Sequence, residues 1–437
     1  MTDNAGAPRH THPIPEQRRR DAPPNWTAAT WDLVRFCRGT PAPSPLPAST
    51  TRAIEQDSFW QLVWQQQALQ PLLPLLYRRL QAASLLPAIP SNARNILRGS
   101  YYAGLLWSDR LTTALHPILD ALAERNVPVT LLKGMALAGG VFGDVGVRPM
   151  VDLDLLVHAR DLPQARAALH QLGYRRSPNP AGHPEPFDEE FGGELEMTCH
   201  DDRGAVVVDL HTQLIAIEWY RHASRLTDVD ALWAGARPLR DYHGNALELS
   251  PEETLIALCV HLAVPEGFWG VVRRLLDVDW LIRRSSPPLD WDRLVTRAEF
   301  FRVRLPVFVC LQLARVVYDT PIPPEETKRL HVPRWRVAAV QRLVNTQLAP
   351  SPTPIGRRAK YLLQLLLVDD MRSLAAMLRH LFFPGRRWLA SRYALQSPTR
   401  TLLYQFFHPL RVIALGLASL WQTRLASTNS VEEIRWN

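Results

Sequence analysis

The spacing of apolar residues changes character twice along the chain, near Asn126 and near Ser250. Before Asn126 and after Ser250, apolar residues recur every three or four positions, which is typical of amphipathic helices. Between these two points they form short runs rich in valine and leucine, bounded by Gly, Pro and Asp, which favour strands. The pattern therefore predicts an α+β fold, with a small mixed β-sheet core flanked by N-terminal and C-terminal helical domains.

Five segments follow from these changes. They are a disordered, proline-rich basic tail at 1–25, an N-terminal helical subdomain at 26–110, the sheet core at 111–245, a helical domain at 246–350 and a basic helical segment at 351–437.

Individual elements can be placed from the same spacing and from Pro, Gly and capping residues. We predict strands at 127–132, 150–157, 174–177, 194–200 and 205–214, with a loop at 178–193 and the end of the sheet-rich part near Tyr242. We predict helices at 31–38, 91–125, 135–142, 162–172, 251–263, 269–284, 291–300 and 303–318, and two more between 57 and 81.

One predicted strand, M-V-D-L-D-L-L-V, holds two aspartates, Asp152 and Asp154. Because side chains on a strand alternate between faces, both carboxylates should lie on one face, and Val151, Leu153 and Leu155 on the other. Neighbouring carboxylates repel each other and stay ionised easily only beside a cation. The pair therefore indicates a metal site, or else a hairpin edge with two solvated aspartates.

Asp209 lies in V-V-V-D-L-H, an apolar strand that gives no other reason for a charge. Three carboxylates from two neighbouring strands suit Mg²⁺, which prefers oxygen ligands and completes its shell with water and phosphate. Two such ions about 3.5–4 Å apart could activate a hydroxyl and stabilise a leaving pyrophosphate.

Composition adds limits to this picture. The chain has 437 residues, a formal net charge of +8 and four cysteines far apart in the sequence. Four widely separated cysteines argue against a disulfide framework and favour a reducing compartment. The N-terminus lacks the apolar run of a secretory signal, and the run at 412–421 is shorter than the roughly 20 residues that span a bilayer. We expect a soluble, cytoplasmic protein without a transmembrane segment.

Positive charge is concentrated between Arg357 and Arg400, where nine Lys or Arg residues face only Asp369 and Asp370. Such a segment could attract an anionic partner. The alternative is a solvated helix face whose arginine stems cover apolar surface.

The runs L-L-K-G-M-A-L, G-D-V-G-V-R-P-M-V-D-L-D-L-L-V and V-D-L-H resemble the uncharacterised nucleotidyltransferase family of the DNA-polymerase-β-like superfamily. The resemblance covers roughly Phe59 to Pro323. It implies Mg²⁺-dependent transfer of a nucleoside monophosphate from an NTP, with ATP expected, to a hydroxyl or phosphate acceptor, releasing pyrophosphate.

By this resemblance, Asp152 and Asp154 bind the metal ions, two in number, and Asp209 is the third carboxylate, placed to help deprotonate the acceptor. Gly134 matches the glycine of the superfamily's G-[GS] turn, where backbone and helix N-terminus approach the phosphates. Lys133 replaces the first glycine of that turn and Met135 its serine. Lys133 could compensate as a point charge on the β- and γ-phosphates.

Alternatives stay open for the neighbouring polar residues. Arg148 is either a phosphate clamp or one half of an ion pair that holds the loop before Asp152. His211 either orients Asp209, contacts substrate or is a hydrogen-bonded structural histidine. Asp277 is expected to pair with Arg273 on a helix surface, four residues away.

Trp269 and Leu276 are expected in the core.

Two functions are therefore compatible with the sequence. The first is a nucleotidyltransferase whose acceptor is a small molecule, a peptide or a protein. Nucleic acid is less favoured because the sequence has no base-reading motif. The second is a catalytically weak or inactive protein of the same fold, which binds an anionic partner through the basic segment.

Overall fold

The computed structural model describes residues 26–177, 184, 187–215, 217–239 and 246–422. The predicted tail at 1–25 lies outside these residues. So do part of the predicted loop at 178–193 and the predicted end of the sheet near Tyr242.

Within this described part, seven strands form one mixed sheet in the order β3-β4-β5-β2-β1-β7-β6. The strands are β1 Val129–Leu131, β2 Leu153–Leu156, β3 Arg175–Arg176, β4 Glu194–Asp201, β5 Gly204–His211, β6 Arg237–Pro238 and β7 Ala246–Glu248. β2 and β5 are parallel, as are β1 and β7, while the other neighbouring pairs are antiparallel.

Helices account for most of the remaining described chain. The α-helices are α1 Ala28–Phe36, α2 Ala48–Ile54, α3 Asp57–Gln65, α4 Leu73–Ala82, α5 Ser91–Ala123, α6 Lys133–Leu137, α7 Leu162–Gln171, α9 Glu218–Arg221, α10 Val229–Trp233, α11 Pro251–Ala263, α12 Val271–Arg284, α13 Trp291–Phe300, α14 Arg304–Tyr318, α15 Pro324–Arg329, α16 Arg334–Val344, α17 Arg357–Leu366, α18 Met371–Phe382, α19 Arg386–Arg392 and α20 Pro398–Gln422. Short 3₁₀ or π segments lie at Gln70–Leu72, Leu86–Ala88, Ala138–Phe142, Val145–Val147, Ala159–Asp161, Asp188–Gly192 and Asn345–Leu348.

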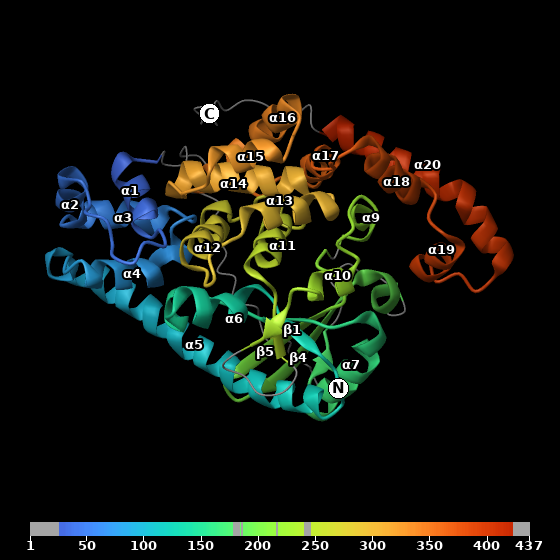
Figure 1. The fold of residues 1–437 in the computed structure, drawn as a ribbon, viewed down its shortest axis with the longest axis horizontal. Helices are drawn as coiled ribbons and strands as arrows, with labels where there is room; N and C mark the ends of the chain where they lie inside the picture. Colours follow the sequence, from blue (N-terminus) through green and yellow to red (C-terminus); the bar gives the residue numbers. More distant parts are fainter. Residues whose placement is uncertain (1–25, 178–183, 185–186, 216, 240–245, 423–437) are drawn as a thin grey trace, which may run out of the picture.

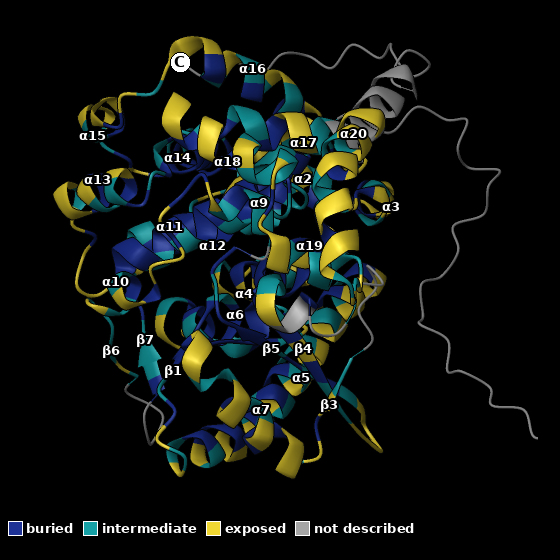
Figure 2. Ribbon diagram, turned by 90° about the vertical axis from the view of Figure 1, so that its right-hand side faces the viewer, coloured by how far each residue is buried: buried dark blue, intermediate teal, exposed yellow. Residues whose placement is uncertain are grey.

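The sheet separates two apolar cores. Leu153 and Leu155 of β2, with Val208 and Leu210 of β5, pack against the long helix α5 and α7. Alternate positions, such as Leu156, contribute to the larger core of the helical segments. Figure 1 shows α5 and α7 along one side of the sheet and α11 and α12 on the other, while Figure 2 shows the dark, buried inner helices α11 and α12. The predicted fold class is confirmed.

Several predicted elements differ at their ends. The strand predicted at 150–157 is confined to Leu153–Leu156, so Val151 precedes it and is exposed, contrary to the predicted alternation. The helix predicted at 135–142 begins at Lys133 and changes to a π-helix at Ala138. The sheet also continues past the predicted end, because β7 pairs with β1.

Among the described residues, no helix is both long enough and apolar enough to span a membrane.

Candidate active site

Two of the predicted carboxylates are brought together by strand register. Asp154 of β2 and Asp209 of β5 are direct partners in the parallel ladder. Both alternate with leucines and valines that pack on α5 and α7, so both carboxylates lie on the opposite face, toward α11 and α12. The prediction that Asp209 lies on a strand next to that of Asp154 is confirmed.

Asp154 is buried and already has two partners. Lys133 Nζ donates to its Oδ1 over 2.9 Å, and His211 Nε2 lies 2.9 Å from the same oxygen. Burial acts to raise the pKa of Asp154, but Lys133 and His211 outweigh it and hold that pKa well below its ordinary value. Of the three alternatives for His211, the structure shows a buried, hydrogen-bonded histidine, and its partner is Asp154 instead of Asp209.

Asp209 has the opposite environment. Its Oδ1 is shielded from solvent and has no hydrogen-bond partner. Burial, followed by the nearby charge of Glu194, raises the pKa of Asp209 to about 7. A buried carboxylate oxygen without a donor is costly unless a cation or a proton is supplied to it. This oxygen is the strongest sign of a ligand site on the sheet.

Asp152 lies one residue before β2 and is half-buried. Burial and the charge of Asp154 raise its pKa, while Lys133 and Arg274 act in the opposite direction. It is therefore electrostatically coupled to the other carboxylates. The ligand atoms that lie within 4.8 Å of one another, however, belong to Asp154, Asp209 and His211, without Asp152.

These donors fit Mg²⁺. The site offers carboxylate oxygens, which Mg²⁺ prefers, and Asp209 Oδ1 has no competing donor. Asp152 sits at the half-buried edge, where a ligand can be added from solvent. His211 is a less suitable Mg²⁺ ligand and is already bonded to Asp154, so it serves better as an orienting residue.

Lys133 has an unusual backbone. Its φ of 44° lies in the left-handed region, which glycine adopts freely and other residues only at a cost. By the resemblance described above, Lys133 takes the place of a glycine. Its left-handed turn brings the lysine ammonium within 2.9 Å of Asp154. Gly134 follows, and a Cβ there would come within 3.0 Å of Met150 Sδ and 3.2 Å of Arg148 Nη1, so the turn is tightly packed.

We expect Lys133→Gly to be more stable than Lys133→Ala by about 1 kcal/mol. Both variants lose the ion pair with Asp154, but only glycine relieves the left-handed strain. At an ordinary helical position the order is reversed, with alanine favoured by a similar amount. Urea denaturation of the two variants measures the difference. An alanine variant at least as stable as the glycine variant would contradict the strained turn.

Arg148 is part of a buried ionic triad. Its Nε and Nη2 each donate to Asp277 over 2.9 Å, and Arg273 Nη1 donates to the same carboxylate. The side chains of Arg148 and Asp277 are 4% and 1% exposed. The ion-pair alternative for Arg148 thus describes what the structure shows. The expected surface position of the Arg273–Asp277 pair is wrong, because the loop before β2 covers it.

The core prediction holds for Leu276, which is 2% exposed, and less fully for Trp269, which is partly buried.

Three polar residues near the carboxylates were not singled out from the sequence. Glu194 faces His211 across the β4–β5 ladder, with 3.7 Å between Glu194 Oε2 and His211 Nδ1. Glu266 Oε1 accepts from Arg274 over 2.9 Å and lies 3.1 Å from His261 Nε2. Arg274 is more exposed than Lys133, the other cation near the carboxylates. The sequence did not show that Arg274 lies near them, because helical spacing does not tell which end of a helix approaches the sheet.

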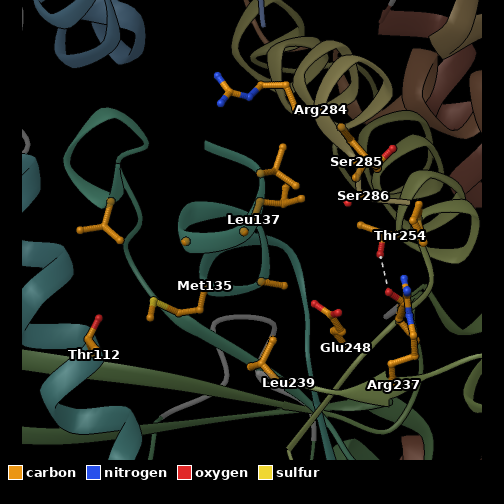
Figure 3. A pocket seen from close by; sticks show the side chains of 18 residues that line it. Thr112, Met135, Leu137, Arg237, Leu239, Glu248, Thr254, Arg284, Ser285 and Ser286 are labelled. Carbon is orange, nitrogen blue, oxygen red and sulfur yellow. Dashed lines mark hydrogen bonds between the residues drawn. The ribbon is translucent and has the colours of Figure 1, made fainter. Parts of the chain in front are cut away.

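A pocket of about 430 Å³ lies beyond α6, and none of the six predicted site residues lines it. Its walls come from α6, β6, β7 and the end of α12. They include Arg237, Glu248 and Ser285, and Figure 3 shows Arg237 and Glu248 near its floor. The carboxylate site is thus separate from this cavity.

Comparisons with known proteins give one family. A family model described as "Uncharacterised nucleotidyltransferase" matches residues 56–319. A comparison with curated proteins found no match. A solved structure titled "Solution Structure of Antibiotic-Resistance Factor ANT(2'')-Ia Reveals Substrate-Regulated Conformation Dynamics" is 15% identical. The alignment covers 44% of this chain and 94% of that one, with a TM-score of 0.30. A score this low assigns neither fold nor function.

Proposed function

Because the chain belongs to the uncharacterised nucleotidyltransferase family, we propose that it transfers a nucleoside monophosphate from an NTP, with ATP as first candidate, to a hydroxyl or phosphate acceptor. The observation that supports this most is the pairing of Asp154 with Asp209 in register, together with the unpartnered Oδ1 of Asp209. A purely structural pair of carboxylates would have its oxygens hydrogen-bonded.

Asp152, Asp154 and Asp209 would hold Mg²⁺, one or two ions, which supplies positive charge to the triphosphate and to the attacking and leaving oxygens. Asp209 would also take the proton of the acceptor hydroxyl, because its carboxylate lies beside that of Asp154 and has an oxygen without a hydrogen-bond partner. The acceptor oxygen forms a bond to the α-phosphorus as the bond to the β-phosphate oxygen breaks. Pyrophosphate carries away that electron pair.

The remaining residues bind and position. Lys133, on the first turn of α6, lies beside the carboxylates and can neutralise the β- and γ-phosphates. Arg274 is a second cation at this edge, and its side chain is 35% exposed. Arg148 acts as a positioning residue, because Asp277 engages two of its guanidinium nitrogens.

A second candidate is a weak or inactive enzyme that binds an anionic partner. It is favoured by one observation: Asp154 is already neutralised by Lys133 and bonded to His211. A cation bound there must compete with that lysine. In this alternative the basic segment after residue 350 would hold the partner.

Pyrophosphate release separates the two. Purified protein is mixed with each NTP, Mg²⁺ and pools of sugars, small amines and alcohols, and peptides. We expect release with at least one NTP and one pool, and its complete loss when the metal is chelated. A nonhydrolysable NTP analogue is titrated in parallel. Binding of the analogue without any release would support the binding protein and reject the enzyme.

A further inference from the structure

Three potential metal ligands gather away from the carboxylate site, where α9 meets α18. They are Glu218, at the start of α9, His222, which caps it, and His380, near the end of α18. Figures 1 and 2 both show α9 and α18 side by side. The spacing of four residues places Glu218 and His222 on one face of their helical turn. Their ligand atoms and that of His380 lie within 4.8 Å of one another.

The three side chains converge on one point. His222 Nε2 lies 3.5 Å from Glu218 Oε1, and His380 Nε2 contacts the same oxygen. The two imidazole rings are stacked, with centroids 3.6 Å apart. Ligand atoms on one tetrahedral ion are about 3.4 Å apart when each bond is about 2.1 Å. The separation of His222 Nε2 from Glu218 Oε1 is close to this value, and the ligand atom of His380 lies within 4.8 Å of both.

Protonation alone explains this arrangement poorly. Two stacked imidazolium ions would repel each other across 3.6 Å, with only one carboxylate between them. If both imidazoles are neutral, each has only one N–H group. Each ring can then contribute at most one hydrogen bond to the shared oxygen of Glu218. The side chains of Glu218 and His380 are only 17% and 19% exposed, so solvent has little access to the polar atoms where they meet.

We propose that Glu218, His222 and His380 form a binding site for one divalent transition-metal ion of the zinc type. Two imidazoles and one carboxylate are a ligand set that zinc accepts, with water in the fourth position, whereas Mg²⁺ prefers oxygen alone. The half-exposed His222 side provides the opening for that water.

The site would join two parts of the chain. Glu218 and His222 lie inside the family-matched residues 56–319, whereas His380 lies outside them. A bound ion would therefore fasten the basic C-terminal segment to the part that carries the carboxylates. The expected role is structural, and it does not depend on nucleotidyl transfer.

Zinc binding to the full chain tests this proposal. After chelation and dialysis, the protein is titrated with Zn²⁺ in excess Mg²⁺, with a competing zinc indicator as readout. We expect one high-affinity ion per chain, weakened at least 100-fold in His222→Ala and in His380→Ala. His200→Ala, which removes an exposed histidine on β4, is the matched control and should bind as wild type.

The carboxylate site must be excluded as the source of binding, since Asp154, Asp209 and His211 also lie close together. Asp209→Asn should retain the ion if the proposal is right. Glu218→Gln keeps the side-chain shape and should still lose binding. Co²⁺ substitution should give visible absorption bands of a low-coordinate site, absent from the His380→Ala protein. Absence of zinc binding in wild type, or its loss in Asp209→Asn alone, would overturn the proposal.

Discussion

Replacing Asp209 by asparagine should reduce Mg²⁺-dependent pyrophosphate release by about 10²–10⁴-fold without destabilising the protein. The change removes one carboxylate from the metal-binding group and removes the proton acceptor beside the incoming hydroxyl. It keeps the size of the side chain, so β5 and its pairing with β2 are retained.

The free energy of unfolding, unlike the activity, should not fall in Asp209→Asn. The Asp209 carboxylate is buried, lies near Glu194 and has a pKa raised to about 7. A carboxyl group whose folded-state pKa is raised disfavours folding once the pH exceeds its unfolded pKa of about 3.9. At pH 8 in metal-free buffer, Asp209→Asn should therefore be at least as stable as wild type, by urea denaturation.

Asp202→Asn is the matched control for this experiment. It removes one negative charge from the turn of the same hairpin, at an exposed position. Turnover of this variant should equal that of wild type. An Asp209→Asn protein that keeps its activity, or that loses activity only by unfolding, would remove Asp209 from the reaction.

The largest loss of stability should follow from Asp277→Ala. Asp277 is the only carboxylate that the structure shows hydrogen-bonded to the buried guanidinium of Arg148, and it also binds Arg273. Its removal leaves two buried cations without this counter-charge, which costs about 3–5 kcal/mol of unfolding free energy. Chemical denaturation of both proteins at pH 7 measures the loss.

The pH dependence of that loss has a definite sign. Burial acts to raise the pKa of Asp277, but Arg148 and Arg273 lower it to about 2. A group with a depressed pKa stabilises the protein above its unfolded pKa, about 3.9, and that stabilisation is lost as pH falls toward the folded value. The difference between wild type and Asp277→Ala should thus be constant from pH 8 to 5 and shrink below about 4.

Asp292→Ala provides the control. Asp292 pairs with Arg329, but its side chain is 80% exposed. Exposed ion pairs of this kind contribute little to stability, because solvent screens them. Equal losses in the two variants would mean that the triad contributes no more than a surface pair.

The carboxylate pair could be predicted because it depends on alternation within two strands. Leu153 and Leu155 fix which face of β2 packs on α5, and Asp154 must then take the other. The same argument failed for Val151, because nothing in M-V-D-L-D-L-L-V shows where strand pairing begins. Strand ends are set by neighbours, and these are distant in the sequence.

Contacts between residues far apart in the sequence could not be predicted for the same reason. The pairing of Arg148 with Asp277 and of β1 with β7 depends on how α12 and the strand before α11 return to the sheet. Two short strands, β6 and β7, carry too few residues for a period to be recognised. The left-handed backbone of Lys133 could not be predicted, because a glycine at that position would have indicated it and a lysine does not.

The pairing of β1 with β7 also has a consequence for the newly made chain. As β1 leaves the ribosome, β2 follows soon after and can pair with it, but the other edge of β1 waits for β7. Arg148 can pair only later, after Asp277 has been synthesised. The nascent sheet therefore keeps an open edge until β7 emerges, and Arg148 lacks its partner carboxylate until α12 emerges. A fragment that stops at residue 245 would remain in that unfinished state.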